Sequence, residues 1–255
     1  MATKKFEFSK DVYLFGTCIV DVGFSDAGID AIKVLESFGI RVHFPMAQSC
    51  CGQPAFTSGN PKEATKVARA QLDLFPESWP IVVLSGSCTG MFRHHYSDLF
   101  KADDPDFERA KSVSDQAVEF TEYLACLPPL KSQNETPVSV VVHTACSAQR
   151  ETDTQSSTQK ILQYWPHVEQ KIADHGTECC GFGGSFSVRF PNISGKMVDD
   201  KCQALEATKA EELISSDCAC MMNINGRLAK RDAKLKGQHI ASFIRAQCLP
   251  ETSHE

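Results

Sequence analysis

Two adjacent cysteines followed by a glycine occur twice in this chain of 255 residues, at positions 50–52 and again at positions 179–181. Each pair has one cysteine about thirty residues before it and another just under forty residues after it. The corresponding gaps in the two halves agree to within one residue, which indicates an internal duplication. The cysteines of the repeat are Cys18, Cys50, Cys51 and Cys88 in the first half, and Cys146, Cys179, Cys180 and either Cys218 or Cys220 in the second.

The overall composition is that of an ordinary globular protein, with 42% hydrophobic and 23% charged residues. The formal net charge is −6, and a chain without a basic surplus is poorly suited to hold a nucleic-acid backbone. No apolar run approaches the roughly 18 residues of a membrane span. The N-terminal residues lack the continuous apolar segment of a signal peptide. We therefore expect a cytoplasmic protein that does not bind nucleic acid.

Twelve cysteines are unusual for a cytoplasmic chain. Disulfides do not persist in a reducing compartment, so clustered cysteines there more often serve metal or redox chemistry. An isolated cysteine such as Cys126, Cys202 or Cys248 is equally well explained as a small buried hydrophobic residue. That explanation does not account for the clustered cysteines.

Each half contains segments typical of strands alternating with segments typical of helices. Short apolar runs end at Cys18 ("DVYLFGTC") and at Cys146 ("VSVVVHTAC"), and such runs are typical of buried strands. We predict an α/β fold of two tandem, pseudo-symmetric Rossmann-like halves with parallel sheets. The cysteines then lie at the carboxyl ends of the strands, where open parallel sheets bind ligands. Residues 1–127 form the first repeat, 128–136 a proline-rich linker and 137–255 the second repeat.

Two helices can be located in the first half. Asn60 is the predicted N-cap of one helix, with Pro61 at its first position and Glu63 at its third. The other helix ends at Gly39, and "IRVHF" is predicted to be the next strand. The apolar residues that indicate this second helix recur at near-helical spacing: Ile29, Ile32, Leu35 and Phe38.

Four thiolates from three separated loops can be interpreted in several ways. Structural zinc sites usually take ligands in close pairs, whereas the intervals here exceed thirty residues. Adjacent cysteines do not easily occupy two corners of one tetrahedral metal, but they can bind different irons of a cluster. A thiol–disulfide enzyme would favour Cys-x-x-Cys at a helix start, and the chain has no such motif. The spacing favours an iron–sulfur cluster over zinc, and zinc over buried thiols.

The glycine after each cysteine pair supports a metal site. Gly52 and Gly181 lack a Cβ, so the backbone can approach an inorganic core and point its amides at sulfur. The segment "GFGG" at 181–184 does not fit the phosphate-binding pattern G-x-G-x-x-G, and its position after two cysteines also disfavours a phosphate loop.

The order of cysteine, Cys-Cys-Gly and cysteine, present twice, resembles the cysteine-rich CCG domain. That domain occurs in one of the subunits of heterodisulfide reductase, in one of those of anaerobic glycerol-3-phosphate dehydrogenase and in the iron–sulfur subunit of glycolate oxidase. A stand-alone chain of this length with two repeats, containing "SGSCTGMFRHHY" and "CMMNINGRL", resembles the lactate-utilisation members of the family. The resemblance covers nearly the whole chain.

This resemblance implies an iron–sulfur oxidoreductase that transfers electrons as one subunit of a multi-protein L-lactate dehydrogenase, oxidising L-lactate to pyruvate. The electrons would pass to the respiratory chain through a ferredoxin-like iron–sulfur subunit and a third small subunit, which could also provide peripheral membrane association. The resemblance implies one four-iron (4Fe–4S) cluster per repeat and assigns no catalytic residue. The implied ligands are Cys18, Cys50, Cys51 and Cys88 for one cluster, and Cys146, Cys179, Cys180 and Cys218 or Cys220 for the other. The alternatives are glycolate, glycerol 3-phosphate or a disulfide as substrate, or a zinc-binding docking module.

Two departures from the family motif affect what the resemblance implies. The full motif ends in Cys-x-x-Cys, which gives five thiolates and a non-cubane cluster in heterodisulfide reductase. Here Met91 stands at the last position of the first repeat, and Met221 follows Cys-Ala-Cys in the second. Four thiolates per repeat favour a conventional four-iron cluster. Equal gaps favour Cys218 as the last ligand, whereas the family phrasing favours Cys220.

Other residues near the cysteines are weaker candidates. Arg93 and His94 follow Cys88 and lie either on a solvated helix face or in a site for a substrate carboxylate. His143 is either a packing residue at a strand end or a hydrogen-bond donor to a cluster sulfur. Arg189, near the second Cys-Cys-Gly, is a candidate for neutralising the charge of a reduced cluster.

Overall fold

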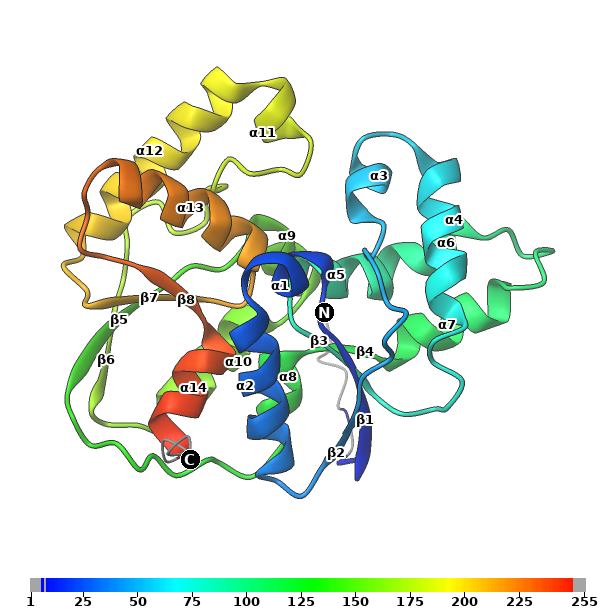
Figure 1. Cartoon of the computed structure of the whole chain (residues 1–255), viewed down its shortest axis with the longest axis horizontal. Coiled ribbons are helices and arrows are strands. Elements are labelled where there is room, and N and C mark those ends of the chain that lie inside the picture. Colours follow the sequence, from blue (N-terminus) through cyan, green and yellow to red (C-terminus); the bar gives the residue numbers. More distant parts are fainter. Residues whose placement is uncertain (1–5, 7, 250–255) are drawn as a thin grey trace.

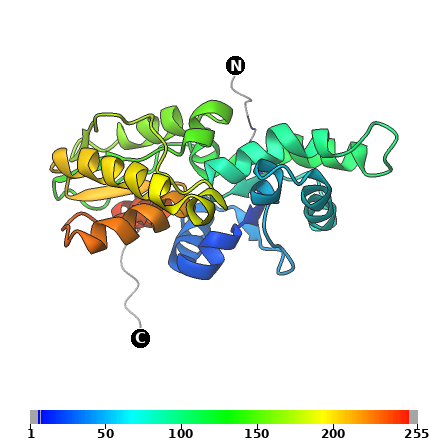
Figure 2. The same cartoon turned by 90° about the horizontal axis from the view of Figure 1, so that it is seen from above.

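A computed structural model describes residue 6 and residues 8–249 of the chain, and two halves of similar build lie side by side in it (Figure 1, Figure 2). The strands are β1 (Asp11–Phe15), β2 (Arg41–His43), β3 (Ile81–Val83) and β4 (Ala117–Glu119) in the first half, and β5 (Val138–Val142), β6 (Val168–Lys171), β7 (Glu212–Ser215) and β8 (Gly237–His239) in the second. The helices of the first half are α1 (Cys18–Gly23), α2 (Ser25–Glu36), α3 (Gln53–Thr57), α4 (Pro61–Leu72), α5 (Gly86–Gly90), the π-helical turn η1 (Met91–His95), α6 (Tyr96–Leu99), α7 (Phe107–Gln116) and α8 (Phe120–Leu124). Those of the second half are α9 (Cys146–Glu151), α10 (Thr154–Leu162), α11 (Phe186–Arg189), α12 (Pro191–Ala207), α13 (Cys218–Lys230) and α14 (Ile240–Cys248).

Both halves contain a four-stranded parallel sheet with the same strand order, β2-β1-β3-β4 in the first and β6-β5-β7-β8 in the second. The order of the strands reverses at the central pair of each sheet, and parallel sheets bind ligands beyond the carboxyl ends of such a pair. The first cysteine of each repeat begins the helix that follows the central strand, Cys18 in α1 and Cys146 in α9. These observations confirm the predicted fold class.

Neighbouring residues of a strand face opposite sides of its sheet, and this alternation divides the core into three clusters. Leu14 and Val140 face a central cluster that contains residues of both sheets. Phe15 faces an outer cluster of the first half, and Val141 faces an outer cluster of the second. The two halves therefore share the central cluster of the core.

The last helix of each half packs on the second helix of the other half. Helix α14 packs on α2, and α8 packs on α10. A pseudo-two-fold axis that relates the two halves produces such reciprocal packing. Figure 1 shows α14 and α2 lying next to each other across the middle of the molecule. Helix α5 of the first half also packs on α9 of the second, and both of these helices carry cysteines of the repeat.

Helix α4 begins at Pro61 after Asn60, as predicted, although the Asn60 side chain does not cap the helix. Its Nδ2 donates to the carbonyl oxygen of Ser58 at 3.4 Å. Helix α2 ends shortly before Gly39, whose φ of 74° suits a residue without a side chain, and β2 follows at Arg41.

The four apolar residues whose spacing indicates α2 are not all buried. Ile29 is 50% exposed, while Ile32 and Phe38 are only partly buried. Ala31 belongs to the central cluster together with residues of α14, so small residues occupy the side on which the other half approaches. The buried positions of α2 are Ala27, Ala31, Val34 and Leu35.

The last strand of each sheet ends in a buried, titratable N-cap residue. Glu119 Oε2 accepts hydrogen bonds from the backbone N–H groups of Thr121 at 2.7 Å and Glu122 at 3.2 Å. His239 Nδ1 accepts one from the N–H of Ala241 at 3.1 Å. Burial raises the pKa of Glu119 to about 8 and lowers the pKa of His239 to about 4. Both residues are thus held uncharged near neutral pH.

We expect Glu119→Gln to stabilise the protein at neutral pH. A carboxyl whose pKa is raised on folding makes its full contribution to the free energy of unfolding below pH 4.5. This contribution is lost as the pH rises toward 8. The loss at pH 7 is about 3 kcal/mol, and glutamine offers the helix a carbonyl oxygen without a charge. The free energy of unfolding in urea should rise by about 2 kcal/mol at pH 7 and change little at pH 4. An equal effect at both pH values would contradict the raised pKa.

Candidate metal centres

Four cysteines of the first half converge at the carboxyl edge of its sheet. Cys18 begins α1 after β1, Cys50 and Cys51 lie in the loop after β2, and Cys88 lies in α5 after β3. Cys51 Sγ donates a hydrogen bond to Cys88 Sγ at 3.2 Å. Cys50 accepts hydrogen bonds from Cys18 and Cys51. The four thiols therefore form one connected group, which we call the first centre.

The second half repeats this arrangement with Cys146, Cys179, Cys180 and Cys220. Cys180 Sγ donates a hydrogen bond to Cys220 Sγ at 3.1 Å, and Cys179 is hydrogen-bonded to Cys146 and Cys180. Cys146 begins α9, the pair lies in the loop after β6, and Cys220 lies in the first turn of α13. We call these four thiols the second centre.

Cys218 does not join the second centre. Its side chain is 2% exposed and packs in the central cluster. Val83 pairs with Glu119 in the first sheet, and Ser215 pairs with His239 in the second. Val83 and Ser215 therefore occupy corresponding positions in the two halves. Cys88 and Cys220 each lie five residues further along the chain. The interval from Cys180 to Cys220 is three residues longer than that from Cys51 to Cys88, and it contains α12, which has 17 residues where α4 has 12; the nearly equal gap to Cys218 is therefore misleading.

The backbone beside each cysteine pair adopts the conformation that glycine allows. Gly52 has a φ of 88° and Gly181 a φ of 81°. Each glycine amide donates to the sulfur of the first cysteine of its pair, Cys50 or Cys179, at 3.4 Å. A Cβ on Gly181 would lie 2.7 Å from the carbonyl oxygen of Ser194, which no other residue type tolerates. The glycines thus place amide donors at the sulfurs, as the sequence suggests.

The second cysteine of each pair is held by a side chain from the following helical region. Tyr96 Oη donates to the carbonyl oxygen of Cys51 at 3.0 Å, and Asn223 Nδ2 donates to that of Cys180 at 2.8 Å. Asn223 stands three residues after Cys220, where the family motif has a fifth cysteine. Met91 stands at the corresponding place in the first half and is fully buried. Each centre therefore offers four thiols.

The close approach of the sulfurs disfavours several thiolates at once. Hydrogen bonds from Cys18 and Cys51 lower the pKa of Cys50. Hydrogen bonding to Cys50, together with burial, raises the pKa values of Cys18 and Cys51 well above their usual range. Four thiolates require a positively charged partner, and an iron–sulfur core supplies that charge to ligands from scattered loops. The donor set of each centre therefore fits such a cluster.

His143 lies against the second centre. Its ligand nitrogen and the Sγ atoms of Cys180 and Cys220 all lie within 4.8 Å of one another. His143 is 2% exposed, and within the described chain its Nε2 has no hydrogen-bond partner. Burial lowers its pKa to about 3, so the imidazole is neutral. This buried histidine therefore lies beside the sulfurs of the second centre.

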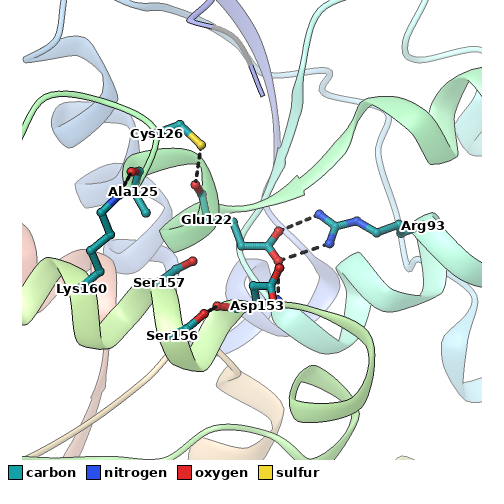
Figure 3. Close-up of a pocket in the computed structure, with 8 residues that line it drawn as sticks. All are labelled: Arg93, Glu122, Ala125, Cys126, Asp153, Ser156, Ser157 and Lys160. Carbon is teal, nitrogen blue, oxygen red and sulfur yellow. Dashed lines mark hydrogen bonds and ion pairs between the residues drawn. The ribbon is translucent and has the colours of Figure 1, made fainter. Parts of the chain in front are cut away.

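Arg93 forms an ion pair with Glu122, with Nη2 and Oε2 2.6 Å apart. Glu122 Oε1 also accepts the backbone N–H of Asp153 in the second half at 2.6 Å. Figure 3 shows these groups around a pocket of about 220 Å³, with Lys160 on its other side. Within the described chain, none of the eight cysteines of the two centres lines this pocket. Arg93 is therefore paired with Glu122 at the junction between the halves and does not lie on a solvated face.

The remaining candidates also make contacts away from the sulfurs. His94 Nε2 lies 2.8 Å from the carbonyl oxygen of Glu151, across the interface between the halves. Arg189 is exposed, and its guanidinium lies over the ring of Phe190 at 5.8 Å from the ring centre. His94 is therefore a residue of the interface between the halves, and Arg189 is a surface residue.

Asp217, which no sequence motif singles out, connects the two centres. Its Oδ1 accepts hydrogen bonds from the hydroxyls of Ser85 and Ser87, each at 2.6 Å. Ser85 Oγ in turn accepts the backbone N–H of Cys88 at 3.3 Å. Asp217 is 1% exposed and precedes the helix that carries Cys220. No short-range pattern reveals this contact, because the partners are about 130 residues apart in the sequence.

Comparison with known proteins extends these findings. The cysteine-rich domain family CCG matches the chain twice, over residues 12–93 and 140–225, and the two segments contain all eight cysteines of the centres. Lactate utilization protein A of Bacillus subtilis (strain 168) is 37% identical to this chain, over 92% of this chain and 99% of the relative. Lactate utilization protein A of Macrococcus caseolyticus (strain JCSC5402) is also 37% identical, over 92% of this chain and 96% of the relative.

A solved structure supports the fold independently. The crystal structure of a hypothetical protein from Helicobacter pylori superposes on 96% of this chain with a TM-score of 0.70. The sequence identity is 10%, and the chain spans 50% of the length of that protein, so the likeness concerns the fold alone. The paired cysteine centres, the two matching segments and the curated relatives agree. The chain therefore belongs to the CCG cysteine-rich domain family and contains two copies of that domain.

Proposed function

We propose that this chain is an iron–sulfur electron-transfer subunit of a multi-protein L-lactate dehydrogenase, which oxidises L-lactate to pyruvate and passes the electrons toward the respiratory chain. The convergence of eight cysteines into two groups of four carries this proposal. Clusters bound there would supply one-electron transfer. The substrate class comes from the relatives, which are named for lactate utilization. The proposed ligands are Cys18, Cys50, Cys51 and Cys88 for one cluster, and Cys146, Cys179, Cys180 and Cys220 for the other.

The packing of the two halves suits the movement of electrons between the centres. Helix α5, which contains Cys88, packs directly on α9, which begins at Cys146. Asp217 ties the loop of the second centre to Ser85 and Ser87 beside the first. Electrons could therefore enter at one centre and leave at the other without crossing the width of the protein.

Each centre has a buried side and an accessible side. Cys51 and Cys180 are 1% and 3% exposed, which excludes water from the inner sulfurs. Cys18 and Cys146, at the starts of α1 and α9, are only half-buried. We propose that the two partners, a ferredoxin-like iron–sulfur subunit and a third small subunit, approach from this accessible side in the cytoplasm. Among the residues that the structure describes, no helix has both the length and the apolar character needed to cross a bilayer.

The proposal is tested with the chain purified anaerobically together with its two partner subunits. L-lactate should bleach the visible absorption of the chain, and Cys51→Ser and Cys180→Ser should each reduce the bleaching. Glycolate and glycerol 3-phosphate serve as matched alternative substrates. Bleaching by either of these, with none by L-lactate, would reject lactate as the substrate while leaving the metal centres in place.

A further inference from the structure

The two centres differ at two corresponding positions. In the first sheet Phe15 pairs with Val83, and Val83 corresponds to Ser215 of the second sheet. In the second sheet Val142 pairs with Ile214, so the next residues, His143 and Ser215, are in register. His143 therefore corresponds to Phe15, which pairs with Val83. An apolar ring therefore stands in one half where an imidazole stands in the other.

The second difference lies on the helix that follows each cysteine pair. Helices α4 and α12 both begin at a proline, Pro61 and Pro191. A Cβ on the glycine of each Cys-Cys-Gly would approach the carbonyl oxygen of the residue three positions after that proline, which confirms the alignment. Gln71 and Lys201 each stand ten residues after their proline and are 1% and 2% exposed. A neutral amide in the first half thus corresponds to an ammonium in the second.

The surroundings of the first centre carry no charge at these two positions. Phe15 is fully buried in the outer cluster that also contains Cys51 and Cys88. Gln71 is satisfied by Ser49, because its Nε2 donates to the Ser49 hydroxyl at 2.8 Å and its Oε1 accepts the Ser49 N–H at 3.3 Å.

The surroundings of the second centre are polar and positively charged. Lys201 Nζ donates to the carbonyl oxygens of His175 at 2.8 Å and Gly176 at 3.4 Å. Its charge lies close enough to influence Cys179, Cys180 and Cys220. A ring nitrogen of His143 lies within 4.8 Å of two of the same sulfurs, those of Cys180 and Cys220, and the Nε2 of His143 has no hydrogen-bond partner in the described chain. Lys201 has no carboxylate among its hydrogen-bond partners in the described chain, and the charge of Glu178 acts on it together with those of the three cysteines.

We propose that Lys201 and His143 make the second centre the site of higher reduction potential, so that a single electron supplied to the chain resides there. Reduction adds one negative charge to a centre, and a buried cation and a nearby N–H donor both favour that charge. Gln71 and Phe15 give the first centre no such help. The inference rests on the proposed function, since both centres must hold iron–sulfur clusters.

The test is a redox titration of anaerobically purified protein with dithionite as the one-electron donor, followed by EPR. We expect two reduction steps, and Cys180→Ser should abolish the step at the higher potential. Lys201→Gln gives the second half the residue of the first, and it should shift that step alone to a more negative potential. Lys201→Arg keeps the charge and should leave the potential near its wild-type value. His143→Phe should act in the same direction as Lys201→Gln.

The mirror variant, Gln71→Lys, tests the same idea in the other half. It should raise the lower potential and bring the two steps closer together. If Lys201→Gln or His143→Phe fails to fold, as judged by circular dichroism, the mirror variant decides the matter. Unchanged potentials in folded, fully iron-loaded variants would overturn the inference. Iron missing from the wild-type protein would instead count against the proposed function, and the iron assay shows this before any titration.

Discussion

Cys220→Ser should halve the iron and acid-labile sulfide bound by each chain, whereas Cys218→Ser should leave both unchanged. Cys220 lies in the first turn of α13 with its sulfur 3.1 Å from that of Cys180. Cys218 stands two residues earlier in the same helix and packs in the central cluster. Loss of one thiolate leaves a four-iron cluster with an incomplete ligand set, and serine is a poor replacement for it.

The measurement is iron and sulfide per chain after anaerobic purification, with circular dichroism to confirm folding. The two variants form a matched pair, because both change a buried cysteine of one helix into serine. Cys88→Ser should behave as Cys220→Ser does, since the two cysteines correspond between the halves. A protein that loses iron with Cys218→Ser and keeps it with Cys220→Ser would contradict the assignment of the second centre.

Gly86→Ala should destabilise the protein by about 3 kcal/mol, because α5 and α9 approach too closely at this point to admit a side chain. A Cβ on Gly86 would lie 2.5 Å from the Cβ of Ala148 and 3.1 Å from the hydroxyl of Thr154. Both partners belong to the second half, so the clash would push the halves apart. Helices α5 and α9 carry Cys88 and Cys146, so iron binding should weaken at both centres.

Urea unfolding measures the loss, and the double variant of Gly86→Ala with Ala148→Gly tests its cause. Removing the opposing methyl group should restore much of the stability, which makes the two effects non-additive. Gly226→Ala is the control, because this glycine also lies in a helix and a Cβ there would meet nothing within 4 Å. It should be neutral or slightly stabilising. A Gly86→Ala protein as stable as the control would show that α5 and α9 can separate without cost.

The duplication and the fold class could be predicted from the sequence because both depend on local patterns. Apolar strands that end at Cys18 and Cys146 place the cysteines at the carboxyl edge of a parallel sheet whatever the details of packing. Seven of the eight cysteines that converge follow from the repeat alone. Their roles as ligands, and the boundaries of the repeats and the linker, remain predictions.

The features that could not be predicted depend on contacts between the halves or on the lengths of helices. Ile29 fits a helical periodicity but faces solvent, because α14 approaches α2 where Ala31 lies. Arg93 resembles a carboxylate-binding residue, yet its partner is Glu122 at the junction with the second half. The interval that contains the longer α12 is three residues longer than its counterpart in the first half, which gives Cys218 a misleading spacing. Lys201 could have been found by aligning the two helices that begin at proline.

The measurement that tests the central claim most directly is the iron, acid-labile sulfide and zinc content of each chain, on protein that has never been exposed to air. We predict about eight irons with matching sulfide, together with the brown colour of iron–sulfur clusters, because two centres with four thiols each should hold two four-iron clusters. Zinc without iron or sulfide would contradict this prediction, and the two cysteine centres would then be structural metal sites.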